Sequence, residues 1–207
     1  MTDPNCVHCN PRSFALEQPL LVADNFYVVC DVHPLIEGHL LIIPKDHISC
    51  AGAFSSELFT EFSALYKKFS DFLKSAYGSV STFEHGITGQ TVFHAHIHLL
   101  PYAGLPESII PEGSRVIHSL SNIKELQQVF LKDGKYLFFS IGDSLWTVDT
   151  AIGVPRFFRD RFANALGVPE RGNWKTMEEN FELMKRAENE TRSLKNKWEQ
   201  FSLNNHA

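Results

Sequence analysis

Residues 93–99, Phe93-His94-Ala95-His96-Ile97-His98-Leu99, alternate strictly between apolar and imidazole side chains. This period of two is typical of a half-buried β-strand, whose successive side chains point to opposite faces. The pattern predicts a strand with His94, His96 and His98 on one face, neighbouring imidazoles being about 6.5–7 Å apart. Imidazole can act as nucleophile, proton carrier or metal ligand near neutral pH. Three in a row therefore indicate a reactive site rather than an ordinary polar surface.

The sequence before this stretch predicts a mixed α+β architecture. Residues 26–32 and 39–44 are rich in β-branched, aromatic and apolar side chains, and we expect them to pair as a hairpin. Apolar residues recur at helical spacing from 58 to 77, and a further strand is expected at 79–84. One long helix among consecutive strands favours an antiparallel α+β layer over a Rossmann unit.

The chain changes character after Pro101, so we expect two regions, residues 1–105 and an extension of residues 106–207 packed on the first. The extension has its own α+β pattern and ends in a long charged helix. Its expected elements are a loop at 102–113, a helix at 122–131, a hairpin of 136–140 with 145–148, a helix at 155–166, and the long helix from Trp174 to about Phe201.

Composition excludes some classes of partner. With 19 basic and 24 acidic residues the net charge is −5, which argues against a general nucleic-acid-binding surface. No stretch approaches the roughly 20 apolar residues of a membrane span. The first residues have neither the basic nor the apolar region of a signal peptide, so we expect a cytoplasmic protein. Its four cysteines should then be reduced, and are candidates for metal ligands before disulfides.

Several motifs around the three histidines resemble the histidine-triad (HIT) family of nucleotide hydrolases and transferases. They are the His-x-His-x-His pattern of residues 94–98, the preceding Gly-Gln-Thr-Val at 89–92, Gly-His-Leu-Leu-Ile-Ile-Pro-Lys-Asp-His at 38–47, and Asp-Val-His-Pro at 31–34. The likeness covers about residues 5–105, and the second region is similar to the C-terminal extension of some microbial members. The resemblance implies a HIT-like antiparallel sheet with packed helices in residues 1–105.

The resemblance also implies a function and a set of residue roles. The substrate would be a nucleotide conjugate, such as a dinucleoside polyphosphate or a nucleoside phosphoramidate, cleaved at the α-phosphate. His96 would be the nucleophile and form a nucleotidyl-histidine intermediate, while His98 would donate to the phosphate or the leaving group. Gln90 and Thr91 can donate hydrogen bonds to phosphate oxygens. Asp31 would accept hydrogen bonds from the ribose hydroxyls.

Two departures from the family pattern concern the phosphate. Residues 83–86 occupy a region where many members have an amide side chain, and His85 or Glu84 could replace it here. We therefore include His85 among the expected nucleotide-binding residues. Tyr102 stands where other members often have an arginine. The missing cation could come from another part of the chain, the candidates being Arg115, Arg156 and Arg159.

Cys6 and Cys9 form a Cys-x-x-Cys pair, which supplies half of a four-ligand structural zinc site. From residue types alone, the other two ligands could be any of Cys30, His33, His39, His47, Cys50 and His94. Family members with this N-terminal pair complete the site with two histidines, which correspond to His47 and His94 here. The resemblance therefore implies a structural zinc that fastens the N-terminal loop to the triad.

Other interpretations of the triad stay open at this point. The three imidazoles could be ligands of a catalytic zinc with bound water. Alternatively the protein could be a non-catalytic nucleotide-binding module that uses its long charged helix to contact a partner. A homodimer is also an expectation, since HIT proteins often pair through the helix and the sheet edge.

Overall fold

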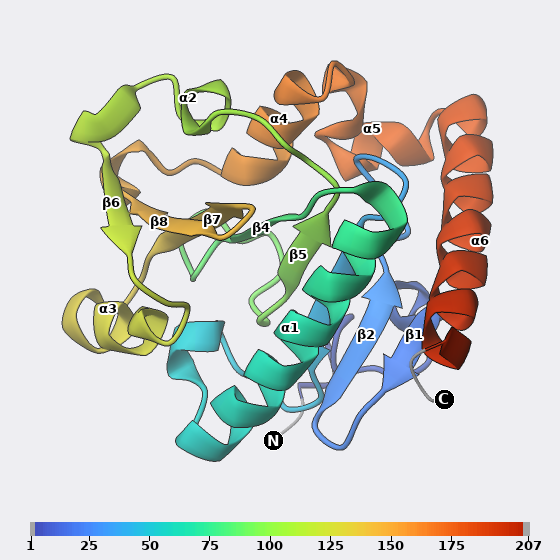
Figure 1. The fold of residues 1–207 in the computed structure, drawn as a ribbon, viewed down its shortest axis with the longest axis horizontal. Coiled ribbons are helices and arrows are strands. Elements are labelled where there is room, and N and C mark those ends of the chain that lie inside the picture. Colours follow the sequence, from blue (N-terminus) through green and yellow to red (C-terminus); the bar gives the residue numbers. More distant parts are fainter. Residues whose placement is uncertain (1–2, 205–207) are drawn as a thin grey trace.

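The computed structural model describes residues 3–204, which form one antiparallel sheet of eight strands with helices on both faces (Figure 1). The strand order is β1-β2-β3-β5-β4-β7-β8-β6. The α+β fold class expected from the sequence is confirmed. The strands are β1 (Pro19–Val22), β2 (Phe26–Cys30), β3 (Leu40–Pro44), β4 (Ser81–Glu84), β5 (Ile97–Leu100), β6 (Ile117–Leu120), β7 (Leu137–Ile141) and β8 (Ser144–Val148).

The long helix α1 (Ser56–Tyr77) crosses one face of the sheet, as Figure 1 shows. The Ser55 hydroxyl accepts a hydrogen bond from the Leu58 amide at its start, and Gly78 ends it in the left-handed conformation. Its apolar stripe is buried with the inward residues of β2, β3 and β5. This packing leaves the opposite face of the central strands available for a site.

The remaining helices belong to the second half of the chain. They are α2 (Pro106–Ile109), α3 (Glu125–Asp133), α4 (Phe157–Ala165), α5 (Trp174–Glu178) and α6 (Phe181–Asn204), with 3₁₀ turns at Phe14–Leu16, Ala51–Ala53, Gly113–Arg115, Thr150–Ile152 and Pro169–Arg171. The single helix expected from Trp174 to Phe201 is wrong. Asn180 interrupts it, since its side chain accepts from the Leu183 amide and caps α6. Among the described residues, no helix is both long and apolar enough to span a bilayer.

The second half of the chain continues the sheet of the first. Strand β7 pairs with β4 over four residues, and β8 and β6 follow outward. Helix α4 covers the face opposite α1, where its Phe158 and Phe162 pack against Phe83 of β4. The edge of β4 that a second copy of the chain could pair with is thus already occupied by β7.

The strand expected at residues 93–99 begins only at Ile97, so its first half is a wrong prediction. The Ala95 amide donates to the Ile48 carbonyl at 2.6 Å, and the His94 amide donates to Val92 at 2.9 Å. These loop contacts replace the ladder that a strand would form. The alternation survives because Ala95, Ile97 and Leu99 are all buried in the core beneath α1. The period of two in this stretch therefore reflects the burial of every second side chain and not the pairing of an extended strand.

Candidate functional site

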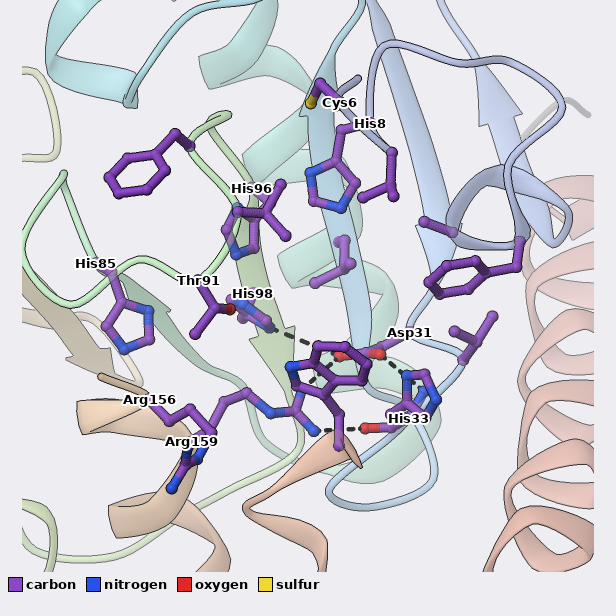
Figure 2. A pocket seen from close by; sticks show the side chains of 18 of the residues that line it. Cys6, His8, Asp31, His33, His85, Thr91, His96, His98, Arg156 and Arg159 are labelled. Atoms are coloured by element: carbon purple, nitrogen blue, oxygen red, sulfur yellow. Dashed lines mark hydrogen bonds and ion pairs between the residues drawn. The ribbon is translucent and has the colours of Figure 1, made fainter. Parts of the chain in front are cut away.

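A cavity of about 670 Å³ lies on the sheet face opposite α1 and is lined by both halves of the chain. The first half contributes polar side chains near the triad, and the second half contributes residues of α4 and α5. The lining residues with polar or aromatic groups include His8, Asp31, His85, Thr91, His96 and His98 from the first half, and Arg156, Arg159, Trp174 and Glu178 from the second (Figure 2).

His96 is held in one tautomer by its own loop. Its Nδ1 lies 2.6 Å from the carbonyl oxygen of His94, and a carbonyl can only accept, so Nδ1 bears the hydrogen. The Nε2 lone pair is then left free on a half-buried ring that lines the cavity. Burial lowers the pKa of His96 below its ordinary value, which favours the neutral form. The geometry therefore presents an unprotonated imidazole nitrogen.

His98 is oriented by a chain of hydrogen bonds that starts at a backbone amide. The Leu35 amide donates to Nδ1 of His39 at 3.1 Å, so the hydrogen of His39 is on Nε2. That atom lies 2.9 Å from Nδ1 of His98, which must accept, so His98 bears its hydrogen on Nε2. This Nε2 is buried and has no hydrogen-bond partner among the described residues. His98 thus offers an unused N–H donor beside His96, the ring centroids being 5.1 Å apart.

Asp31 is buried, and each of its carboxylate oxygens accepts a hydrogen bond from the protein. Its Oδ2 accepts from Arg159 at 2.9 Å, and its Oδ1 accepts from the His33 amide at 2.9 Å. Burial raises the pKa of Asp31, but the opposing effects of His39, Arg159 and the His33 amide are larger, so the pKa is lowered. Arg159 also donates to the His33 carbonyl at 2.8 Å, and Figure 2 shows this network along one side of the cavity. No sequence signal linked Asp31 to Arg159, which is 128 residues away.

His85 lines the cavity, whereas Glu84 is not among the lining residues. Nε2 of His85 accepts from the Phe158 amide of α4 at 3.2 Å, so its hydrogen is on Nδ1. Burial lowers the pKa of His85 to about 3, which makes it a neutral donor. Glu84 instead accepts from the Ala51 amide at 2.8 Å and from the Tyr136 hydroxyl at 2.5 Å. Of the two candidates for the missing amide, only His85 is placed at the site.

Among the remaining expected residues, some line the cavity and others do not. Thr91 is exposed and lines the cavity, but Gln90 does not line it, and the Gln90 amide donates to the Ser49 carbonyl at 2.8 Å. Of the three candidate arginines, Arg156 and Arg159 line the cavity and Arg115 does not. The expected roles of Gln90 and Thr91 stay predictions.

Cys6, Cys9, His47 and His94 come together as a four-residue cluster, with all four ligand atoms within 4.8 Å of one another. The Cys9 sulfur lies 3.3 Å from Nδ1 of His47 and 3.4 Å from Nδ1 of His94, and the Cys6 sulfur lies 3.5 Å from Nδ1 of His94. A tetrahedral zinc with ordinary Zn–S and Zn–N bonds places such atoms about 3.5 Å apart. Nε2 of His94 lies 2.8 Å from the Pro44 carbonyl, which leaves Nδ1 as the free ligand atom. The donor set and its spacing fit a structural zinc ion.

The three triad histidines do not converge on one point. His94 belongs to the cysteine cluster, while His98 forms a second close group with Asp31 and His39 among the described residues. In that group the two imidazoles are hydrogen-bonded to each other and the carboxylate is paired with Arg159. The atoms that face one another in this group are therefore already paired without a metal, and nothing in this geometry favours the triad as catalytic zinc ligands.

His8, between the two cysteines, is a site residue that the sequence did not single out. Its ring is buried and contacts both His94 and His96, with centroid distances of 5.5 and 5.0 Å. Only its position inside the Cys-x-x-Cys pair could have indicated this, because a metal at that pair would hold the loop against the triad. The Cys/His cluster therefore lies next to the cavity, and Cys6, His8 and His47 line it.

Comparison with known proteins identifies one domain of the chain. The sequence profile of the HIT domain matches residues 17–104. The chain contains a HIT domain. An uncharacterized HIT-like protein of Borreliella burgdorferi is 29% identical over 129 residues, 59% of this chain and 93% of that protein. An adenosine 5'-monophosphoramidase of Saccharomyces cerevisiae is 29% identical over 100 residues, 48% of this chain and 63% of that protein.

A solved structure of a HIT family protein from Bacillus anthracis is 20% identical, with a TM-score of 0.45, and covers 64% of this chain and 97% of that one. The HIT profile ends at residue 104, before β6, β7, β8 and helices α2–α6. The cavity is consequently built partly by residues outside the matched domain, namely Arg156, Arg159, Trp174 and Glu178.

Proposed function

We propose that this HIT protein is a hydrolase or nucleotidyltransferase that cleaves a nucleotide conjugate at its α-phosphate through a nucleotidyl-histidine intermediate on His96. The supporting observation is the 2.6 Å contact between His96 Nδ1 and the His94 carbonyl, which leaves the Nε2 lone pair free at the cavity. A yeast relative is named an adenosine 5'-monophosphoramidase, which supports the nucleotide class.

The reaction proceeds in two displacements at phosphorus. In the first, the His96 Nε2 lone pair forms a bond to the α-phosphorus, and the bond to the leaving group breaks with its electron pair on the leaving group. In the second, a water or another acceptor oxygen bonds to phosphorus and the phosphorus–nitrogen bond breaks, which returns neutral His96 and releases a proton. The unused His98 Nε2–H donates to a phosphate oxygen where charge builds up.

The nucleoside occupies the side of the cavity near Asp31. Asp31 accepts from the ribose hydroxyls with lone pairs that the protein leaves unused, since each carboxylate oxygen has more than one acceptor position. The rings of Phe14 and Trp174 lie near His33, at centroid distances of 6.2 and 5.8 Å, and they would supply aromatic surface for a base. The sugar and base would thereby be held while the α-phosphate faces His96.

We also propose that Cys6, Cys9, His47 and His94 hold a zinc ion with a structural role. The ion would fix the N-terminal loop and the His94 main chain, whose carbonyl orients His96. Metal content measured by mass spectrometry tests this. We expect about one zinc per chain, lost in Cys6→Ser and retained in Cys30→Ser, which changes a buried thiol outside the cluster. Undiminished zinc in Cys6→Ser would contradict the assignment.

The nucleophile is tested by trapping the intermediate. The protein is mixed with a nucleotide conjugate radiolabelled at the α-phosphate, quenched in base, and digested to locate the label. We expect base-stable, acid-labile label on His96, and no label and a loss of turnover of about 10⁴-fold or more in His96→Asn. The control is His118→Asn, an exposed histidine outside the cavity.

Normal turnover without any trapped label would overturn the assignment of His96. Retained nucleotide binding with no turnover in the wild-type protein would favour the non-catalytic module instead.

A further inference from the structure

Two arginines reach the cavity, Arg156 just before α4 and Arg159 in its first turn, but only one is available to a ligand. Arg159 is 9% exposed, and its guanidinium donates to Asp31, His33, Arg171 and Gly172. Arg156 is 33% exposed, and its guanidinium contacts Asp160 at 3.4 Å. Charge-assisted hydrogen bonds are ordinarily about 2.7–2.9 Å long, so this pairing is loose. Arg156 can therefore turn its guanidinium to an anion at little cost.

The main chain of Arg156 is fastened to the triad loop. Arg156 has φ 62°, the left-handed conformation, which costs a non-glycine residue on the order of 1 kcal/mol or more. Its amide donates to the Gly89 carbonyl at 3.3 Å, two residues before Thr91. A side chain on Gly89 would collide with the Val154 carbonyl, so the two segments are in direct contact. The strain is thus used to hold Arg156 at the edge of the reactive site.

Further donors line the same cavity as Arg156, and the acidic side chains Asp31 and Glu178 of its lining already have partners. His85 offers its Nδ1–H and Thr91 its hydroxyl, and both line the same cavity. Asp31 is paired with Arg159, and Glu178 lies 3.1 Å from His33. In Figure 2 His85 and the two arginines lie below and to the left of His96, and His8 lies above and to its right. In-line displacement sends the leaving group away from the attacking nitrogen, and in the proposed reaction it would lie toward His85 and Arg156.

We propose that Arg156, with His85 and Thr91, forms a subsite for a phosphate of the leaving group, so that the protein selects nucleoside 5'-polyphosphate conjugates, such as dinucleoside polyphosphates, over phosphoramidates. This inference rests on the proposed function and names its substrate class. Arg156 is the specificity-determining residue because it supplies the one loosely paired cation among the residues described as lining the cavity.

The chemistry of departure supports the same selection. A nucleoside diphosphate or triphosphate leaves as a stable anion when its bond to the α-phosphorus breaks, and it needs no proton. An amine leaving group must receive a proton. His85 and His98 are both buried, and burial keeps the pKa of each below the ordinary value, so neither is an acid at neutral pH. The cavity is therefore suited to an anionic leaving group.

The test compares one protein on two substrates. We expect the kcat/KM of Arg156→Gln to fall about tenfold or more with diadenosine tetraphosphate and to change less than twofold with adenosine 5'-phosphoramidate. Arg156→Lys keeps the charge and the backbone conformation and should recover part of the loss. Arg115→Gln removes an exposed arginine outside the cavity and should change neither substrate. Equal losses on both substrates, or no loss on either, would overturn the subsite.

A binding experiment separates this proposal from the proposed function. In His96→Asn, which removes the nucleophile, we expect ADP to bind about tenfold more tightly than AMP. The added Arg156→Gln change should abolish that difference. Equal affinity for ADP and AMP would overturn the subsite even where turnover supports His96. A wild-type protein that cleaves neither substrate but prefers ADP would overturn the reaction and keep the subsite.

Discussion

The two walls of the cavity differ in what their polar atoms are bound to. The N-terminal wall, formed by Thr91, His96 and His98, presents a free Nε2, an unused N–H and an exposed hydroxyl. The C-terminal wall is formed by Arg156, Arg159 and Trp174. The guanidinium of Arg159 already donates hydrogen bonds to four other residues of the protein. The first wall therefore leaves polar groups without protein partners, while on the second wall Arg159 is bound to other residues of the protein.

Two buried contacts join the two halves of the chain. Arg159 pairs with Asp31, and the Tyr136 hydroxyl donates to Glu84. Each contact links the HIT domain to a residue beyond its end at residue 104. Variants that remove these contacts test how the two halves of the chain are held together. Variants that remove single donors facing the cavity test what each wall contributes to activity.

The largest effect is expected from Arg159→Met. The change leaves the buried Asp31 carboxylate without its cation, and such unpaired charges cost about 3–5 kcal/mol of unfolding free energy. Denaturant titration measures it. Arg161→Met, on the same helix but in a partly exposed pair with Glu112, should cost about 1 kcal/mol or less.

A double variant shows where the cost of Arg159→Met comes from. Adding Asp31→Asn removes the stranded charge, so the double variant should be more stable than Arg159→Met alone. If the double variant is no better, the loss comes from packing of the Arg159 stem and the ion pair does not hold the walls together.

A smaller, pH-dependent effect is expected at Glu84. Burial raises its pKa from 4.5 to about 7, so the folded protein holds this proton more tightly than the unfolded chain. Stability from this group therefore falls as pH rises from 4.5 to 7, by about 2 kcal/mol between pH 5 and 8. Glu84→Gln should lack that fall, so the wild type should lose stability relative to the variant as pH rises.

The matched control for this measurement is Glu199→Gln, an exposed carboxyl on α6. Its stability should follow the wild type at every pH. A difference between wild type and Glu84→Gln that stays constant from pH 5 to 8 would show that Glu84 is ionised throughout this range.

The sequence predicted local order well because local order depends on neighbours in the chain. Ser55, the apolar stripe and Gly78 define α1, and the β2–β3 hairpin follows from its apolar runs. Cys6, Cys9, His47 and His94 form the expected cluster. This prediction came from the resemblance to the HIT family and not from the spacing of the residues. The strand at residues 93–99 was extended too far because burial of alternate residues gives the same period as a pleat.

The partners of the site could not be predicted because they come from distant segments. Nothing near Asp31 indicates Arg159, and nothing near His98 shows that His39 and the Leu35 amide fix its tautomer. The strands β1 and β6 were missed because each is a four-residue edge strand that depends on its neighbour for order. Pairing of β7 with β4, which sets the position of the C-terminal wall, is likewise a long-range contact.

The smallest effect is expected where the sequence treated two donors alike. Gln90 and Thr91 were both expected to contact phosphate, but only Thr91 lines the cavity. Thr91→Val should lower kcat/KM about three- to tenfold, the value of one neutral hydrogen bond, and Thr91→Ser should restore it. Gln90→Met removes the bond to the Ser49 carbonyl and should cost about 1 kcal/mol of stability with kcat/KM changed less than threefold. A larger loss of kcat/KM in Gln90→Met than in Thr91→Val would mean that the loop turns Gln90 toward bound substrate. The N-terminal wall would then gain a donor that is bound to the Ser49 carbonyl in the free protein.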